Sequence, residues 1–101
     1  MSGRRTGRLR TDLQNLPGVG PSIEGDLVSL GVERVEDLVG RNPRAMYDDL
    51  CRLEGGHVDR CVLYVFRCAV YCAGTDHPEP DRRNWWWWKD DNRNAFPPEF
   101  R

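Results

Sequence analysis

Apolar residues recur at three- and four-residue intervals along most of the chain, in short runs that glycine and proline interrupt. Leu13 and Leu16 predict a short helix over residues 12–16, which Thr11 caps. Residues 21–30 predict a second helix, because proline suits its first position and glycine follows its last residue. A tight turn rich in glycine is therefore expected between the two helices.

Three further helices are predicted downstream. Residues 33–39 carry valine and leucine on one face, and Asn42 followed by proline marks the start of a fourth helix that ends before a pair of glycines. Residues 59–73 predict a fifth helix. Its centre, residues 62–66, has the β-branched and aromatic composition of a strand. The length of the run, about fifteen residues without a turn, favours the helix.

These patterns predict an all-α fold, with five helices in one compact domain over residues 11–73. The chain has 101 residues, which is enough for one modest core. Residues 1–10 predict a flexible basic arm. Residues 74–101 are rich in proline and tryptophan and are expected to pack on the helices, with a loose end around residues 96–98.

The second half of the predicted domain is similar to the first. Aligning residues 50–64 with residues 13–27 matches Leu50 with Leu13, Leu53 with Leu16, Gly55 with Gly18, His57 with Gly20 and Tyr64 with Leu27. This spacing is that of a helix-hairpin-helix unit that occurs twice, the second copy being degenerate. The alternative is coincidence among leucines and glycines in a helical chain.

The turn between the first two helices has the composition of a phosphate-binding hairpin. Its glycines permit the backbone angles of a tight turn. Free amides are predicted among residues 19–22, at the positive end of the second helix, where a phosphate oxygen can accept hydrogen bonds. The candidate phosphate-binding residues are Gly18, Val19, Gly20 and Ser22. The alternative is a purely structural turn that lets two helices pack closely.

Charge changes this picture. The net charge is −1 and the pI is about 6.1, whereas domains that coat DNA usually carry a basic surplus. Glu24 and Asp26 place carboxylates beside the predicted site, where they repel phosphate. The candidate auxiliary contacts of the basic arm are Arg4, Arg5, Arg8 and Arg10. We therefore expect weak binding that does not depend on base sequence.

A second candidate surface lies on the predicted fifth helix, where Arg60, Tyr64, Arg67 and Tyr71 share one stripe. Alternating arginine and tyrosine can clasp a nucleic-acid backbone or stack on bases, so Arg60 and Arg67 are further candidates. The alternative is that the stripe is the least buried side of a core helix, with its tyrosines tucked in.

The cysteines offer a candidate metal site. Cys68 and Cys72 lie one helical turn apart, but a structural zinc site usually has two close ligand pairs and the sequence shows one. The pattern favours buried free thiols that act as small apolar side chains.

Four consecutive tryptophans carry more aromatic surface than one small domain can bury. They are Trp85, Trp86, Trp87 and Trp88. Two or three of the rings are expected to clamp the C-terminal segment onto the helices. The alternative is an exposed surface that stacks on single-stranded bases or contacts a protein partner.

Residues 13–23 resemble the helix-hairpin-helix motif. With residues 35–38, residues 61–71 and the tryptophan run that ends at Lys89 and Asp90, they resemble a small bacterial family labelled pathogenicity-locus or mitomycin-resistance proteins. The resemblance implies an all-helical, SAM-like helix-hairpin-helix fold and DNA binding.

Together these observations predict an accessory DNA-binding module that is not an enzyme, because neither histidine lies near a catalytic set. A protein-interaction adaptor is the alternative, and a small zinc or redox protein is a third class. No cofactor is expected. The chain shows neither a secretory signal nor an apolar run of membrane-spanning length, so we expect a cytoplasmic location and no membrane contact.

Overall fold

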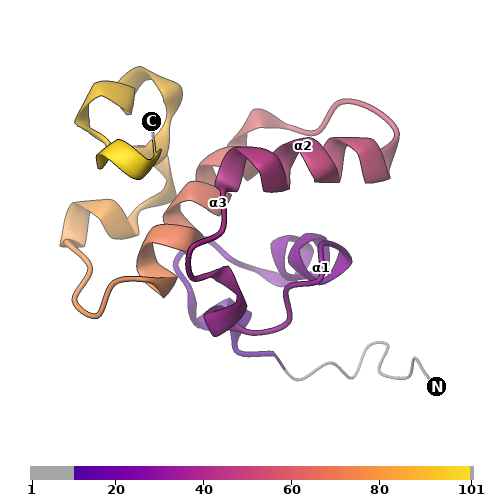
Figure 1. The fold of residues 1–101 in the computed structure, drawn as a ribbon, viewed down its shortest axis with the longest axis horizontal. Coiled ribbons are helices and arrows are strands. Elements are labelled where there is room, and N and C mark those ends of the chain that lie inside the picture. The colour runs from indigo at the N-terminus through magenta and orange to yellow at the C-terminus, as the bar shows by residue number, and fades with distance from the viewer. Residues whose placement is uncertain (1–10, 101) are drawn as a thin grey trace.

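The computed structural model describes residues 11–100, in which every regular element is helical and strands are absent. Three α-helices form the body of the fold (Figure 1): α1 (Pro21–Ser29), α2 (Pro43–Glu54) and α3 (Arg60–Ala73). Six short 3₁₀ helices complete the described part: η1 (Leu13–Asn15), η2 (Val35–Leu38), η3 (Pro80–Arg83), η4 (Trp85–Trp88), η5 (Asp90–Ala95) and η6 (Pro98–Phe100). The all-α prediction is confirmed. None of the helices among residues 11–100 has both the length and the continuous apolar surface that a membrane span requires.

The α-helices begin and end close to the predicted residues. Gly31 follows α1 with a left-handed φ of 86°. Asn42 caps α2 by accepting hydrogen bonds from two backbone amides, and Asp59 caps α3 by accepting one. Residues 62–66 lie inside α3, so the prediction of a helix over the competing strand is confirmed.

Two of the five predicted helices are only 3₁₀ turns. The helix predicted over residues 12–16 is reduced to η1, and the one predicted over residues 33–39 is reduced to η2. A segment this short leaves most of its backbone groups without an α-helical partner, and the tighter 3₁₀ turn suits such pieces. The described part of the chain therefore has three α-helices where five helices were predicted.

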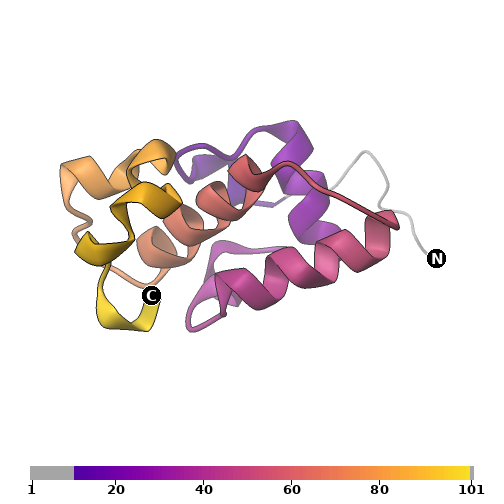
Figure 2. The same cartoon turned by 90° about the horizontal axis from the view of Figure 1, so that it is seen from above.

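α3 is the central element, with the N-terminal half on one side and the C-terminal segment, residues 74–100, on the other (Figures 1 and 2). The main core joins one side of α3 to the N-terminal half and includes Leu63, Phe66, Ala69 and Val70 together with Leu13, Leu27, Leu38 and Leu50. A second, smaller core joins α3 to the C-terminal segment and consists of Cys68, Tyr71, Trp88 and Phe96.

The C-terminal segment is fixed to α3 by aromatic packing. Trp88 and Phe96 are 0% and 1% exposed, and their ring centroids lie 5.0 Å apart. The indole N–H of Trp88 donates to the carbonyl of Arg82 at 2.9 Å. Burial of rings this large offsets the entropy lost when the segment is ordered. The predicted packing is thus present, but the expectation of a loose end around residues 96–98 is wrong.

The two glycine-containing turns share a backbone conformation but not a packing pattern. Gly18 and Gly55 have φ values of 81° and 77°. Leu16 is 8% exposed, whereas Leu53, its counterpart in the sequence alignment, is 60% exposed. The junction of α2 and α3 therefore lacks the buried leucine of the first turn, and a duplicated unit stays a prediction.

Candidate nucleic-acid interface

The turn between η1 and α1, residues 16–20, is called here the glycine turn. The backbone N–H of Val19 donates to the carbonyl of Leu16 at 3.2 Å, and Gly18 between them has a φ of 81°. Proline at the second position and a left-handed glycine at the third are the pattern of a type II turn. The sequence of the turn thus determines its backbone path.

Val19 differs from its predicted role. Its amide is occupied inside the turn, and its side chain, 6% exposed, belongs to the main core. Gly18 is also structural, because a Cβ at this position would lie 3.3 Å from Cδ1 of Trp85 while φ is left-handed. These two residues shape the turn, and Val19 offers no free amide to an anion.

The amides of Gly20, Ser22 and Ile23 lie at the amino end of α1, where a helix leaves its first N–H groups without intrahelical partners. Within residues 11–100, no acceptor is paired with these three amides. The first bond of the helix runs from the amide of Glu24 to the carbonyl of Gly20 at 2.9 Å. The positive end of the helix dipole acts at the same place, so an anion is favoured here.

Gly20 leaves room for a ligand. Its φ of −103° is accessible to any residue, and an added Cβ would meet none of the described atoms within 4 Å. The fold therefore does not require glycine at this position, whereas the close approach of a phosphate to the backbone benefits from one. Gly18 and Gly20 thus have separate roles, which their spacing in the sequence does not reveal.

Glu24 lies in the first turn of α1 but is held toward η1. Its carboxylate accepts hydrogen bonds from the hydroxyl of Thr11 and from Nε2 of Gln14, the latter at 2.9 Å. These bonds, that of Thr11 foremost, lower the pKa of Glu24, so the carboxylate stays ionised near neutral pH. At Asp26, burial and then the Glu54 carboxylate raise the pKa. At Glu24 the negative charge predicted to oppose phosphate is therefore present.

A hollow of about 340 Å³ adjoins the glycine turn and is lined by Pro17, Pro80, Arg83 and Asn84. The packing of Trp85 against Gly18 brings the C-terminal segment to this place. Arg83 is exposed, so it supplies the positive charge that the turn itself lacks. Arg83 was not predicted as a site residue, because no local sequence pattern links it to a turn so far away in the chain.

Arg60 and Arg67, predicted as auxiliary nucleic-acid contacts, bind the C-terminal segment. Nε of Arg60 donates to Asp90 at 2.9 Å, and Nη1 of Arg67 donates to Asp90 and to the Trp88 carbonyl, both at 3.0 Å. The bonds from Arg60 and then Arg67 lower the pKa of Asp90 to about 2. Arg67 is 7% exposed, so it lies under the C-terminal segment rather than on an open surface.

The four tryptophans have different surroundings. Trp88 is buried in the second core, Trp85 and Trp87 are half-buried, and Trp86 is 54% exposed. Trp85 and Trp86 meet edge to face, with ring centroids 5.8 Å apart. Trp88 is therefore buried by the protein itself, as expected of a ring that clamps the C-terminal segment, and a protein partner at the tryptophans stays a prediction. Of the four tryptophans, Trp86 has the largest exposed fraction.

Cys68 and Cys72 form a pair of thiols in the interface between α3 and the C-terminal segment. Cys68 is 0% exposed, and its thiol donates to the Arg82 carbonyl at 3.5 Å. The hydrogen bond between the thiols raises the pKa of Cys68 and lowers that of Cys72. Across residues 11–100, histidine, cysteine and acidic side chains form no group of three or more that would hold a metal ion.

The fold and this surface define a small all-helical domain whose glycine turn presents backbone donors beside an arginine from the C-terminal segment. The chain belongs to the pathogenicity locus family, whose model matches residues 7–94. No curated protein and no solved structure matches the chain. The broader part of the predicted resemblance is thus confirmed, while the helix-hairpin-helix and mitomycin-resistance parts stay predictions.

Proposed function

We propose that this protein binds the phosphate backbone of DNA without reading base sequence, with η1, the glycine turn and α1 acting as a helix-hairpin-helix unit. The observation that carries the proposal is the group of amides at Gly20, Ser22 and Ile23, which have no acceptor within the described residues. They lie at a helix N-terminus with open space at Gly20. A phosphate oxygen is an acceptor that fits such donors.

Arg83 complements the amides in this proposal. It lines the hollow beside Pro17, so a DNA strand that approaches the glycine turn also passes an exposed guanidinium. Each arginine that neutralises a phosphate releases a condensed counterion. The predicted contribution of Arg4, Arg5, Arg8 and Arg10, which lie outside the described residues, would add to the same effect.

The affinity is expected to be modest. Glu24 and Asp26 keep carboxylates near the phosphate, and the whole chain has a net charge of −1. Binding that rests on backbone phosphate alone typically has dissociation constants of about 10⁻⁴–10⁻⁶ M at physiological salt. We place the protein in this range and expect the affinity to fall as salt is added.

Substitutions at Gly20 and Ser22 test the proposal without removing the fold. Gly20→Val fills the open space over the amides, and Ser22→Glu places a carboxylate there that suits the helix dipole but repels phosphate. Each variant should keep its thermal stability and bind a short DNA duplex at least about tenfold more weakly in fluorescence anisotropy, the loss of one charged hydrogen bond. Wild-type affinity in both stably folded variants would exclude the glycine turn as the DNA site.

Two further variants separate local contact from general charge. Ser29→Glu adds the same charge at the other end of α1 and should change DNA binding much less than Ser22→Glu. Arg83→Gln should weaken binding to all DNA sequences alike and reduce the slope of log affinity against log salt by about 1.

A protein-interaction adaptor is a second candidate function, favoured by the exposure of Trp86. A ring that is 54% exposed on an ordered segment offers apolar area to a partner. Under this function, Trp86→Ala would remove binding of a protein partner identified by pull-down, whereas Gly20→Val would leave that binding intact.

A further inference from the structure

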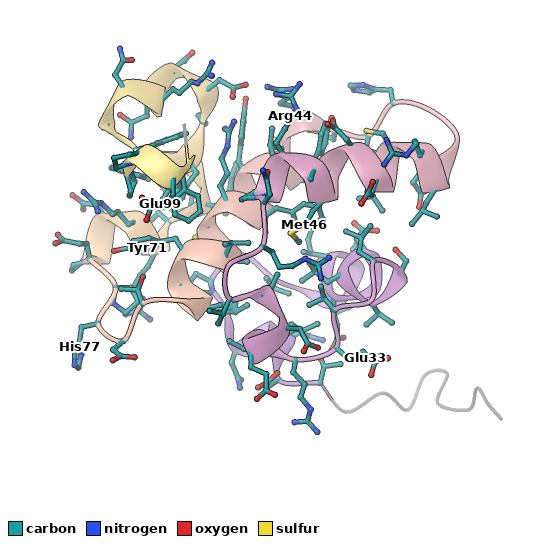
Figure 3. The ribbon with its side chains drawn as sticks, in the orientation of Figure 1. Glu33, Arg44, Met46, Tyr71, His77 and Glu99 are labelled. Atoms are coloured by element: carbon teal, nitrogen blue, oxygen red, sulfur yellow. The ribbon has the colours of Figure 1, made fainter. Side chains whose placement is uncertain are left out.

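A second basic cavity lies away from the glycine turn, where the start of α2, the side of α3 and the C-terminal segment meet. Its volume is about 160 Å³. Figure 3 shows Arg44 at the start of α2 and Glu99 on the C-terminal segment, and both residues line the cavity. The volume is several times the roughly 30 Å³ that one water occupies in the liquid, so a group of several atoms fits.

The lining of this cavity carries an excess of positive charge. The ionised residues around it are Arg44, Arg60, Arg67, Arg93, Asp90 and Glu99. Four arginines therefore line the cavity with two carboxylates, and a third carboxylate, Asp48, pairs with Arg44 from outside the lining. The hydrogen bonds from Arg60 and then Arg67 lower the pKa of Asp90 to about 2, so its charge is constant over the physiological range. The charge excess therefore does not depend on pH near neutrality.

Several arginine N–H groups in this cavity remain available to a ligand. Arg60 uses Nε, and Arg67 uses Nη1, to bind Asp90. The Arg60 side chain also forms a hydrogen bond with the Tyr64 hydroxyl. Among residues 11–100, no acceptor is paired with Nη2 of Arg67. Arg44 forms an ion pair with Asp48 at 3.4 Å, but both side chains are more than half exposed, so this pair is weak.

We propose that this cavity binds a phosphate monoester. Such a group carries a charge between about −1.5 and −2 at neutral pH. This is more negative than one backbone phosphodiester, so it gains more from a lining in which arginines outnumber carboxylates. Planar guanidinium groups bind phosphate oxygens through paired N–H donors. The proposal does not depend on DNA binding at the glycine turn, because the two sites share no lining residue.

A titration of the full-length protein tests the cavity. Thymidine 5′-monophosphate, inorganic phosphate and thymidine are added separately at constant ionic strength, with sodium chloride as the balancing salt, while NMR follows the arginine side-chain resonances. The two phosphates should give saturable shifts and thymidine should not. Arg44→Gln should weaken phosphate binding about tenfold, the effect of one charged hydrogen bond.

Arg52→Gln is the matched control. Arg52 also lies on α2 and also pairs with an aspartate, Asp49, but it does not line the cavity. This variant should bind phosphate as the wild type does. If Arg44→Gln binds like the wild type, or if chloride produces the same shifts as phosphate, the cavity is not a phosphate site.

A further titration uses the Gly20→Val variant, which lacks the proposed DNA contact at the glycine turn. It shows whether the phosphate bound in the cavity belongs to the end of a DNA strand or to a free nucleotide. A short DNA strand with a 5′-phosphate is compared with the same strand ending in a 5′-hydroxyl and with thymidine 5′-monophosphate. Tighter binding of the phosphorylated strand identifies a strand end as the ligand, and tighter binding of the mononucleotide identifies a free nucleotide. Equal binding of the two strands, with no response to the mononucleotide, would contradict the proposal.

Discussion

The two sides of α3 contact their partners with different chemistry. Toward the N-terminal half, α3 contributes buried hydrocarbon side chains, such as Leu63 and Phe66. Toward the C-terminal segment, the helix presents Arg67 to Asp90 and the ring of Tyr71 to that of Trp88. Apolar surfaces tolerate exchange of side chains of similar volume, whereas a buried guanidinium needs particular acceptors. The second interface therefore depends on fewer residues, each with a larger individual effect.

Removing Trp88 should break the second interface and have the largest effect. The side chain is 0% exposed, and its indole N–H binds the Arg82 carbonyl. Trp88→Ala should lower the free energy of unfolding by about 3–5 kcal/mol, the cost typical of deleting a large buried aromatic ring. Urea denaturation followed by circular dichroism measures the loss.

Trp86→Ala is the control for this substitution. Its ring is 54% exposed, so the free energy of unfolding should change by about 0.5 kcal/mol or less. Similar losses for the two variants would show that the second core contributes little to stability.

Gly18 tests the point at which the C-terminal segment reaches the N-terminal half. Gly18→Ala puts an ordinary residue at a left-handed φ, which costs about 1–2 kcal/mol, and brings a Cβ to 3.3 Å from Trp85. Gly55→Ala imposes the same backbone cost in open space. Gly18→Ala should therefore lower the thermal midpoint more than Gly55→Ala does.

Gly20→Ala completes this series. Its φ is ordinary and its Cβ has room, so the thermal midpoint should stay the same or rise slightly. Equal thermal midpoints for Gly18→Ala and Gly55→Ala would mean that the Trp85 side chain moves away from the new Cβ without loss of stability. The contact between Gly18 and Trp85 would then contribute little to the free energy of unfolding.

Acid should weaken the second interface through Asp90, and this contribution should be the smallest of the three effects. The folded pKa of Asp90, about 2, lies below its ordinary value of 3.8, so this carboxylate stabilises the fold above about pH 4. The contribution is lost as pH falls toward 2. Because the side chain is 37% exposed, solvent screening reduces the contribution to roughly 1 kcal/mol.

Urea denaturation at several pH values measures this contribution, with Asp90→Asn as the comparison. The variant should be less stable near neutrality and lose less stability than the wild type between pH 4 and pH 2. Parallel pH profiles for the two proteins would show that Asp90 is not stabilised by the two arginines.

Local patterns were sufficient to predict the α-helices. The Asn42 and Asp59 caps and the left-handed glycines act within one helical turn, so neighbouring residues determine them. The same holds for the glycine turn, where proline and glycine set the backbone path. The lengths of the first and third predicted helices were overestimated, because hydrophobic spacing does not show whether a short segment completes an α-helical turn.

The geometry of the candidate site was predicted only in part. Gly20 and Ser22 lie at the amino end of α1, as the helix pattern predicted, but the occupied amide of Val19 depends on a hydrogen bond across the turn. The positions of Arg67 and Arg83 depend on how the C-terminal segment packs, which no periodic pattern encodes.

The sequence by itself determined the helical class, the helix ends and the glycine turn, because backbone propensities and caps act between residues that are close in the chain. Only the tertiary structure decided that Gly18 supports Trp85 while Gly20 stays open. It also decided that Asp90 holds Arg60 and Arg67. These contacts join residues more than twenty positions apart, and their free energy depends on shape and charge that meet only after the chain has folded.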